Sequence, residues 1–190
     1  EYRVISDRLE AGTFLLAAVV TGGEIMLTDV DPKMLTSVIA HLRKASAEVL
    51  YGSNWIRLKM DRSCPKPVDI HTAAYPGFPT DLQAQWVVLN ALADGDSVVC
   101  EQLFENRFMH VQELQRMNAD LQVRQNKVMI RGRKQLLGAP VVATDIRASA
   151  SLVLAGLAAV GETVISEVHL IDRGYEAIEA KLMQLGVENV

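Results

Sequence analysis

The sequence repeats itself three times, and this repetition limits the fold more than any other feature. In each copy an aspartate heads an apolar, alanine-rich segment that ends at a glycine 14 to 16 residues later. The three pairs are Asp7 and Gly22, Asp81 and Gly95, and Asp145 and Gly161. A short β-branched or apolar run follows each glycine, and then a more polar helical segment. We predict three copies of helix–strand–helix–strand, in repeats of about 1–70, 71–135 and 136–190.

The first helical segment of each repeat is apolar almost all round, which is typical of a buried helix. These segments are Phe14–Val20, Trp86–Leu92 and Leu152–Val160. Residues 55–60 instead alternate between apolar and polar side chains, as in a strand with one dry and one wet face. We therefore expect an α/β fold with helices inside and half-exposed sheets outside. A doubly wound sheet would need strands that are apolar throughout.

Local signals mark the ends of these helices. Ser46, Asn118 and Gly186 occupy equivalent places just past the second helices, where a residue with a left-handed backbone commonly ends a helix. Thr80 and Gln83 have the spacing of a capping box at the start of the second buried helix.

Composition excludes several classes of protein. Apolar residues make up 49% of the 190 residues, which rules out intrinsic disorder, and a net charge of −4 argues against a nucleic-acid partner. The longest uncharged helical stretch, 148–161, is too short to cross a membrane. Two cysteines and four scattered histidines lack the spacing of metal ligands, so we expect no metal and no cofactor. The polar segment 1–10 is unlike a signal peptide, and we expect a reduced, cytoplasmic protein.

Four arginines break a local rule. Arg8, Arg107, Arg147 and Arg173 each follow a residue of the capping type, at what we predict to be a helix start. The helix dipole disfavours a cation there by several tenths of a kcal/mol. A guanidinium beside a helix N-terminus suits phosphate or carboxylate, so the pattern indicates an anion site; exposed structural ion pairs are the alternative.

Asp81 follows a stretch, 75–80, in which two prolines and a glycine restrict the backbone. Rigid loops that end at a helix start often present catalytic groups. A carboxylate in a first helical turn is also an ordinary residue stabilised by the helix dipole. Both interpretations stay open at this point.

Four stretches, in this order, carry a resemblance: Phe78–Gln85, Phe104–Val111, Ala143–Ser151 and Ile171–Glu176. They resemble the motifs of the enolpyruvyl transferases, and among these the UDP-N-acetylglucosamine 1-carboxyvinyltransferases. Such an enzyme has two similar inside-out α/β barrel domains, each of three βαβαββ-like repeats, facing one another across a cleft. The resemblance covers essentially the whole chain but only about half of the enzyme. It implies one domain, 1–190, that contains the C-terminal part and lacks the domain with the catalytic cysteine.

The resemblance implies transfer of enolpyruvyl from phosphoenolpyruvate to the 3-hydroxyl of UDP-N-acetylglucosamine, the first committed step of peptidoglycan synthesis. Asp81 is then expected to contact the sugar and to act in proton transfer, with a pKa raised by cleft closure and desolvation. Arg107, Arg147 and Arg173 are expected to approach phosphoenolpyruvate, and Leu103 to contact the UDP-sugar. The complete expected substrate-binding set is Asp81, Leu103, Thr80, Glu105, Asp145 and Arg8.

Two other hypotheses remain. The chain alone is a non-catalytic binding or folding unit that carries half a cleft, because the implied partner domain is missing. Alternatively, it belongs to the transferase of the same fold that acts on shikimate 3-phosphate, although the run 104–110 favours the UDP-sugar enzyme. The expected partners are the two substrates and the missing domain, with no nucleic acid and no membrane.

Overall fold

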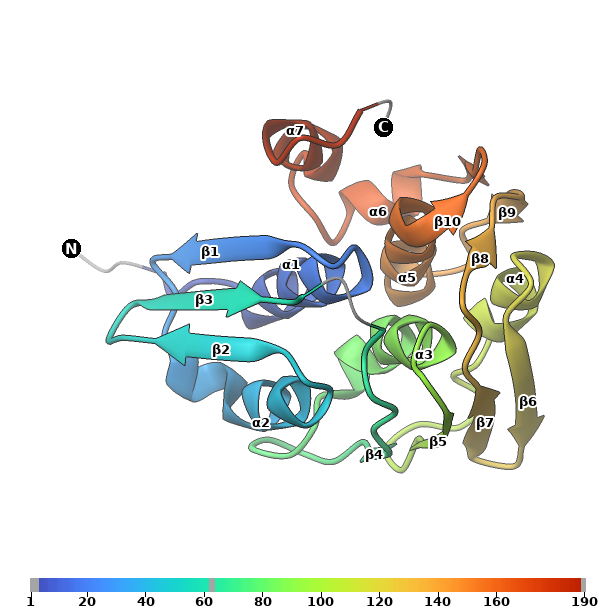
Figure 1. Cartoon of the computed structure of the whole chain (residues 1–190), viewed down its shortest axis with the longest axis horizontal. Coiled ribbons are helices and arrows are strands. Elements are labelled where there is room, and N and C mark those ends of the chain that lie inside the picture. Colours follow the sequence, from blue (N-terminus) through green and yellow to red (C-terminus); the bar gives the residue numbers. More distant parts are fainter. Residues whose placement is uncertain (1–3, 62–63, 189–190) are drawn as a thin grey trace.

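The computed structural model describes residues 4–61 and 64–188, whose elements fall into three groups along the chain (Figure 1). The first group contains α1 (Arg8–Val20), β1 (Glu24–Thr28), η1 (Pro32–Leu35), α2 (Thr36–Lys44), β2 (Glu48–Tyr51) and β3 (Trp55–Lys59). The second contains β4 (Ile70–His71), η2 (Thr80–Leu82), α3 (Gln83–Ala91), β5 (Asp96–Cys100), α4 (His110–Arg116), β6 (Asp120–Arg124) and β7 (Lys127–Arg131). The third contains β8 (Leu136–Leu137), β9 (Pro140–Val142), α5 (Ile146–Ala158), β10 (Ala159–Val160), β11 (Val164–Ser166), α6 (His169–Asp172) and α7 (Ile178–Gln184).

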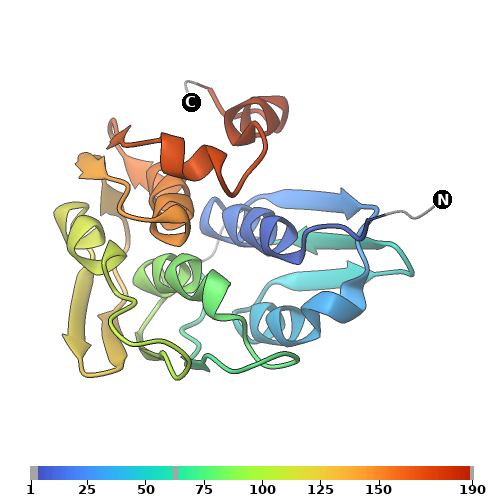
Figure 2. The same cartoon turned by 180° about the vertical axis from the view of Figure 1, so that it is seen from behind.

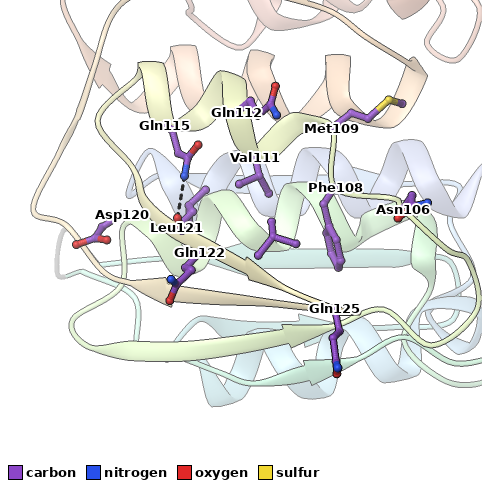
Figure 3. A pocket seen from close by; sticks show the side chains of 11 residues that line it. Asn106, Phe108, Met109, Val111, Gln112, Gln115, Asp120, Leu121, Gln122 and Gln125 are labelled. Carbon is purple, nitrogen blue, oxygen red and sulfur yellow. Dashed lines mark hydrogen bonds between the residues drawn. The ribbon is translucent and has the colours of Figure 1, made fainter.

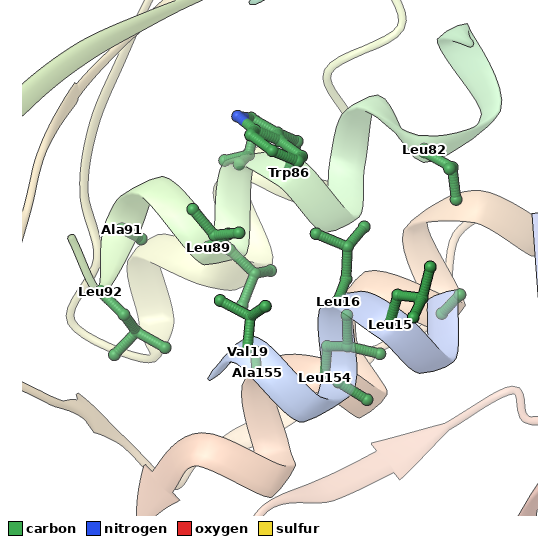
Figure 4. Close-up of a cluster of buried hydrophobic side chains, with 14 of the residues drawn as sticks. Leu15, Leu16, Val19, Leu82, Trp86, Leu89, Ala91, Leu92, Leu154 and Ala155 are labelled. Atoms are coloured by element: carbon green, nitrogen blue, oxygen red, sulfur yellow. The ribbon is translucent and has the colours of Figure 1, made fainter. Parts of the chain in front are cut away.

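Helices α1, α3 and α5 pack against one another and form the centre of the core. Figure 2 shows the three helices together in the middle, with α2 and α4 farther out. The side chains between them are drawn in Figure 4 and include Leu15, Leu16, Val19, Leu89, Leu154 and Ala155. This packing confirms the prediction of inner helices, because a helix that is apolar on all sides is stable only when other elements surround it. Within the described part of the chain, no helix has both the length and the apolar composition needed to cross a membrane.

The sheets lie outside these helices and show the predicted alternation. Strand β3 buries Ile56 and Leu58, while its neighbouring side chains are partly or fully exposed. It pairs antiparallel with β1 and β2, and the second group forms a sheet of order β4-β5-β7-β6. The third group has two short parallel pairs, β8 with β10 and β9 with β11. The fold is therefore mixed α/β, and among the described residues these sheets do not join into a closed barrel.

The predicted helix ends are correct. Ser46, Asn118 and Gly186 have φ values of 75°, 68° and 93°, so all three adopt the left-handed conformation that stops the second helices. The predicted capping box is wrong. The 3₁₀ turn η2 precedes α3, and the Thr80 hydroxyl contacts side chains from another part of the chain instead of the backbone of α3.

Candidate active site

Three equivalent aspartates precede the buried helices, and the structure separates their roles. Asp7 caps α1, with Oδ1 accepting hydrogen bonds from backbone N–H groups at 2.7 and 3.3 Å. Asp145 caps α5 in the same way, at 2.8 and 3.0 Å. Asp81 lies within η2, ahead of α3, and accepts no hydrogen bond from a backbone N–H group of the described residues. The Asp81 carboxylate is therefore free to bind side chains instead of capping a helix.

Two arginines converge on Asp81. Arg107 Nη2 lies 2.9 Å and Arg147 Nε 2.6 Å from the same carboxylate oxygen, Oδ1. The side chains are 24%, 21% and 39% exposed for Asp81, Arg107 and Arg147, so the cluster is reachable from solvent. No hydrogen bond joins Oδ2 to a described residue. The site thus combines one open carboxylate oxygen with two guanidinium groups.

The pKa of Asp81 lies below its ordinary value of 3.8. Burial raises this pKa, but the hydrogen bonds and charges of Arg147 and then Arg107 lower it by more. In the chain by itself, two guanidinium groups that the sequence did not place here bind the carboxylate and keep its pKa low. The predicted rise concerns the closed cleft and stays a prediction.

A buried glutamate that no sequence motif indicated lies behind this cluster. Glu101 directly follows β5 and is 2% exposed. Its Oε2 accepts a hydrogen bond from the Thr80 hydroxyl at 2.7 Å, and Thr80 Oγ1 accepts one from Arg107 Nη1 at 2.7 Å. The only sign in the sequence is a charged residue that directly follows an apolar strand.

The prediction that Arg107 and Arg173 lie at helix starts is wrong. Arg107 lies in the loop ahead of α4, and Arg173 follows α6, at a helix end that favours cations. Arg173 is exposed and forms no hydrogen bond or ion pair with any described residue. The next residue, Gly174, packs on the start of α5, where a Cβ would lie 2.4 Å from Ile146 Cγ2. This contact brings the Arg173 segment near Arg147, but the convergence of Arg173 itself stays a prediction.

The other expected ligand-binding residues lie around the same end of the helices. The Arg8 guanidinium lies over the Tyr75 ring, 5.3 Å from its centroid, beside the loop that leads to Asp81. Leu103 and Glu105 are exposed. The backbone N–H of Leu103 donates to Glu101 Oε1 at 2.9 Å, so this donor is already used within the chain.

His110, the first residue of α4, is fully buried and has a pKa of about 4. Burial is the main cause; the Asp145 charge raises the pKa and the Arg107 charge lowers it again. This histidine is therefore neutral at pH 7, and the positive charge of the site comes from arginines. Among the described residues, no group of three or more His, Cys, Asp and Glu side chains is close enough to hold a metal ion.

A surface hollow lies between α4 and the β6 strand, next to the loop of Arg107 (Figure 3). It is lined by Asn106, Phe108, Met109, Val111, Gln112, Gln115, Asp120, Leu121, Gln122, Val123 and Gln125. Asp120 is the one ionisable side chain among them. The hollow therefore carries little charge beside the cluster of Asp81, Arg107 and Arg147, and that cluster is the better candidate for chemistry.

Residues 1–182 match the family described as EPSP synthase (3-phosphoshikimate 1-carboxyvinyltransferase), and the chain belongs to this family. Its curated relatives include UDP-N-acetylglucosamine 1-carboxyvinyltransferases of Halorhodospira halophila (strain DSM 244 / SL1) and Coxiella burnetii (strain Dugway 5J108-111). Each is 54% identical to the chain over 187 residues. These matches cover 98% of the chain but only 44% and 43% of the relatives, so the chain spans less than half of their length.

Solved structures agree with this family. The enolpyruvyl transferase NikO from Streptomyces tendae matches 97% of the chain and 44% of that protein, with a TM-score of 0.87 and 26% identity. An EPSP synthase from Acinetobacter baumannii matches 95% of the chain and 46% of that protein, with a TM-score of 0.74 and 20% identity. The second likeness concerns the fold alone.

Proposed function

We propose that the chain is one half of a transferase that moves enolpyruvyl from phosphoenolpyruvate to the 3-hydroxyl of UDP-N-acetylglucosamine. The observation that carries the proposal is the Asp81 carboxylate bound by Arg107 and Arg147. It occurs in a chain that is 54% identical to relatives named for this activity. In this proposal, residues 1–190 form one domain of three repeats in an inside-out arrangement, with buried helices and outer sheets. A second domain with the catalytic cysteine completes the cleft in the cytoplasm.

The arrangement suggests how substrate binding activates the base. Two guanidinium groups suit the phosphate and carboxylate of phosphoenolpyruvate, because their N–H donors match such oxygens in pairs. When the substrate takes these donors, Asp81 loses the hydrogen bonds that lower its pKa and also faces a new negative charge. The carboxylate then accepts a proton more readily, which a general base at neutral pH requires.

The proposed reaction balances as an addition followed by an elimination. In the addition, the 3-hydroxyl oxygen bonds to C2 of phosphoenolpyruvate, its proton passes to Asp81, and C3 gains a proton from an acid on the partner domain. In the elimination, C3 returns a proton to the partner-domain group, the bond from C2 to the phosphate oxygen breaks, and inorganic phosphate leaves with the proton that Asp81 took from the hydroxyl. Arg107, Arg147 and Arg173 stabilise the charge that moves between carboxylate and phosphate.

A carboxyl titration tests the role of the cluster. The pKa of Asp81 is measured by carbon-13 NMR of the chain, with and without phosphoenolpyruvate, and the Asp81→Asn variant identifies its signal. We expect phosphoenolpyruvate to raise this pKa. Asp120, which pairs with Arg133 at 3.1 Å on the surface, is the matched control and should not respond. An unchanged Asp81 pKa under saturating ligand contradicts the proposed activation.

A phosphate-release assay tests the substrate and the role of the half chain. The chain alone should release no phosphate, because it spans less than half of its relatives. Addition of the complementary half of the Halorhodospira halophila relative should allow release with UDP-N-acetylglucosamine as acceptor. The family description also favours a test of 3-phosphoshikimate. Turnover by the chain alone contradicts the half-cleft view, and a preference for 3-phosphoshikimate contradicts the proposed acceptor.

A further inference from the structure

Glu101 is the most heavily bonded buried carboxylate near the site. Its Oε1 accepts hydrogen bonds from the Thr72 hydroxyl at 2.7 Å and from the backbone N–H groups of Leu103 and Phe104 at 2.9 and 3.2 Å. Its Oε2 accepts one from the Thr80 hydroxyl at 2.7 Å. Burial of a carboxylate is costly unless such donors compensate it, so this arrangement calls for an explanation.

Two of the residues that Glu101 binds, Thr80 and Phe104, also contact the Arg107 side chain. Thr80 Oγ1, held by Glu101, accepts a hydrogen bond from Arg107 Nη1 at 2.7 Å. The backbone of Phe104 is also held by Glu101, and the Arg107 guanidinium lies 4.8 Å from the centroid of the Phe104 ring. Both routes therefore restrain the guanidinium that binds Asp81.

We propose that Glu101 is a positioning residue, which fixes the Arg107 guanidinium beside Asp81 through the Thr80 hydroxyl and the Phe104 ring. This inference rests on the proposed function, in which Arg107 receives an anionic group of the substrate. Glu101 acts through these neighbours and contacts neither Arg107 nor Asp81 directly by hydrogen bond.

A carboxylate suits this role because its oxygens only accept hydrogen bonds. The Thr80 hydroxyl must donate to Oε2, which leaves the lone pairs of Thr80 for Arg107. In Glu101→Gln, the amide oxygen must remain with the three donors at Oε1. The amide nitrogen then faces Thr80 as a donor, and the Thr80 hydrogen loses its acceptor. The substitution keeps the size of the side chain but reverses the direction of the bond that orients Arg107.

The test measures the pKa of Asp81 in the ligand-free chain and in two variants, Glu101→Gln and Thr80→Val. We expect this pKa to rise in both, because Arg107 no longer stays fixed against the carboxylate. The loss of a negative charge at Glu101 acts in the opposite direction, since one fewer neighbouring anion lowers the pKa of Asp81. A rise therefore reports the position of Arg107 and not the change in charge.

Thr72→Val is the matched control, because it removes a hydrogen bond of the same length to Glu101 but leaves the bond from Thr80 to Arg107 in place. It also removes the hydrogen bond from the Gln102 backbone N–H to Thr72. It should leave the Asp81 pKa unchanged even if it lowers stability. An unchanged or lower Asp81 pKa in Glu101→Gln, or an equal rise in Thr72→Val, overturns the inference. If Glu101→Gln does not fold, Thr80→Val still tests the link between Glu101 and Arg107. An unchanged Asp81 pKa in Thr80→Val then overturns the inference. This test uses the ligand-free chain, so its result does not depend on substrate binding. A phosphoenolpyruvate titration that leaves the Asp81 pKa unchanged therefore contradicts the proposed function and not the positioning role of Glu101.

Discussion

Tyr175 ties the segment that carries Arg173 to the buried helices, and its hydroxyl offers a measurable test of that anchor. The residue is 6% exposed and follows α6. Its hydroxyl oxygen lies 2.9 Å from Thr13 Oγ1 of α1 and accepts a longer hydrogen bond, at 3.4 Å, from Gln85 Nε2 of α3. Three parts of the chain that are distant in sequence thus meet at one polar contact inside the core.

The structure sets the expected cost of Tyr175→Phe. The substitution keeps the ring and removes the hydroxyl, so one short buried hydrogen bond is lost and one long one with it. Thr13 Oγ1 keeps its contact with Gln85 Nε2 at 3.3 Å, which limits the damage. A neutral buried hydrogen bond contributes about 0.5–1.5 kcal/mol, so we expect a loss of roughly 1–1.5 kcal/mol in the free energy of unfolding. For a chain of this length that corresponds to a fall in Tm of about 2–6 °C.

Urea denaturation followed by circular dichroism measures this change. Tyr51→Phe is the matched control, because Tyr51 is 50% exposed and its ring keeps the contact with Arg43. The control should alter the free energy of unfolding by less than about 0.5 kcal/mol. Equal stability of Tyr175→Phe and the unchanged chain would show that this hydroxyl does not hold the Arg173 segment. The reasoning about the anchor would then be refuted.

Three further predictions follow from the same structure. Asp81→Asn should lower the stability at pH 7 by about 1 kcal/mol, because two partly exposed ion pairs are lost. The folded pKa lies below 3.8, so the carboxylate stabilises the fold above that pH, and denaturation curves should show the difference vanish as the pH falls through the folded pKa. The pKa of His110 is about 4 against 6.5 unfolded, so stability should fall by about 3 kcal/mol between pH 6.5 and 4. His110→Gln should remove that dependence in denaturation curves at both pH values, and His169→Gln, at an exposed site, should keep it. Gly132→Ala should cost about 1–3 kcal/mol in thermal unfolding, because its Cβ would lie 1.9 Å from a backbone oxygen. Gly156→Ala, with 3.5 Å to its nearest neighbour, should instead be neutral or stabilising.

The helices and their ends could be predicted from the sequence because the patterns that indicate them lie within a few neighbouring residues. The apolar surface of residues 14–20 shows that this helix is buried, whatever surrounds it. Ser46 and Asn118 mark helix ends that depend on a few neighbouring residues. Thr80 shows the limit of such signals. Its spacing to Gln83 is that of a cap, yet its hydroxyl is bound by groups 21 and 27 residues away.

The sequence by itself determined three buried helices preceded by aspartates and the strands between them, and it singled out arginines whose role toward anions stays a prediction. These features follow from periodicity and from the preferences of short segments. Only the tertiary structure decided that Asp81 faces two guanidinium groups while Asp7 and Asp145 cap helices. The decisive contacts join Asp81 to residues 26 and 66 positions later, and Glu101 enters through the same long-range packing. No local pattern encodes such distances, because they exist only after the three helices have packed together.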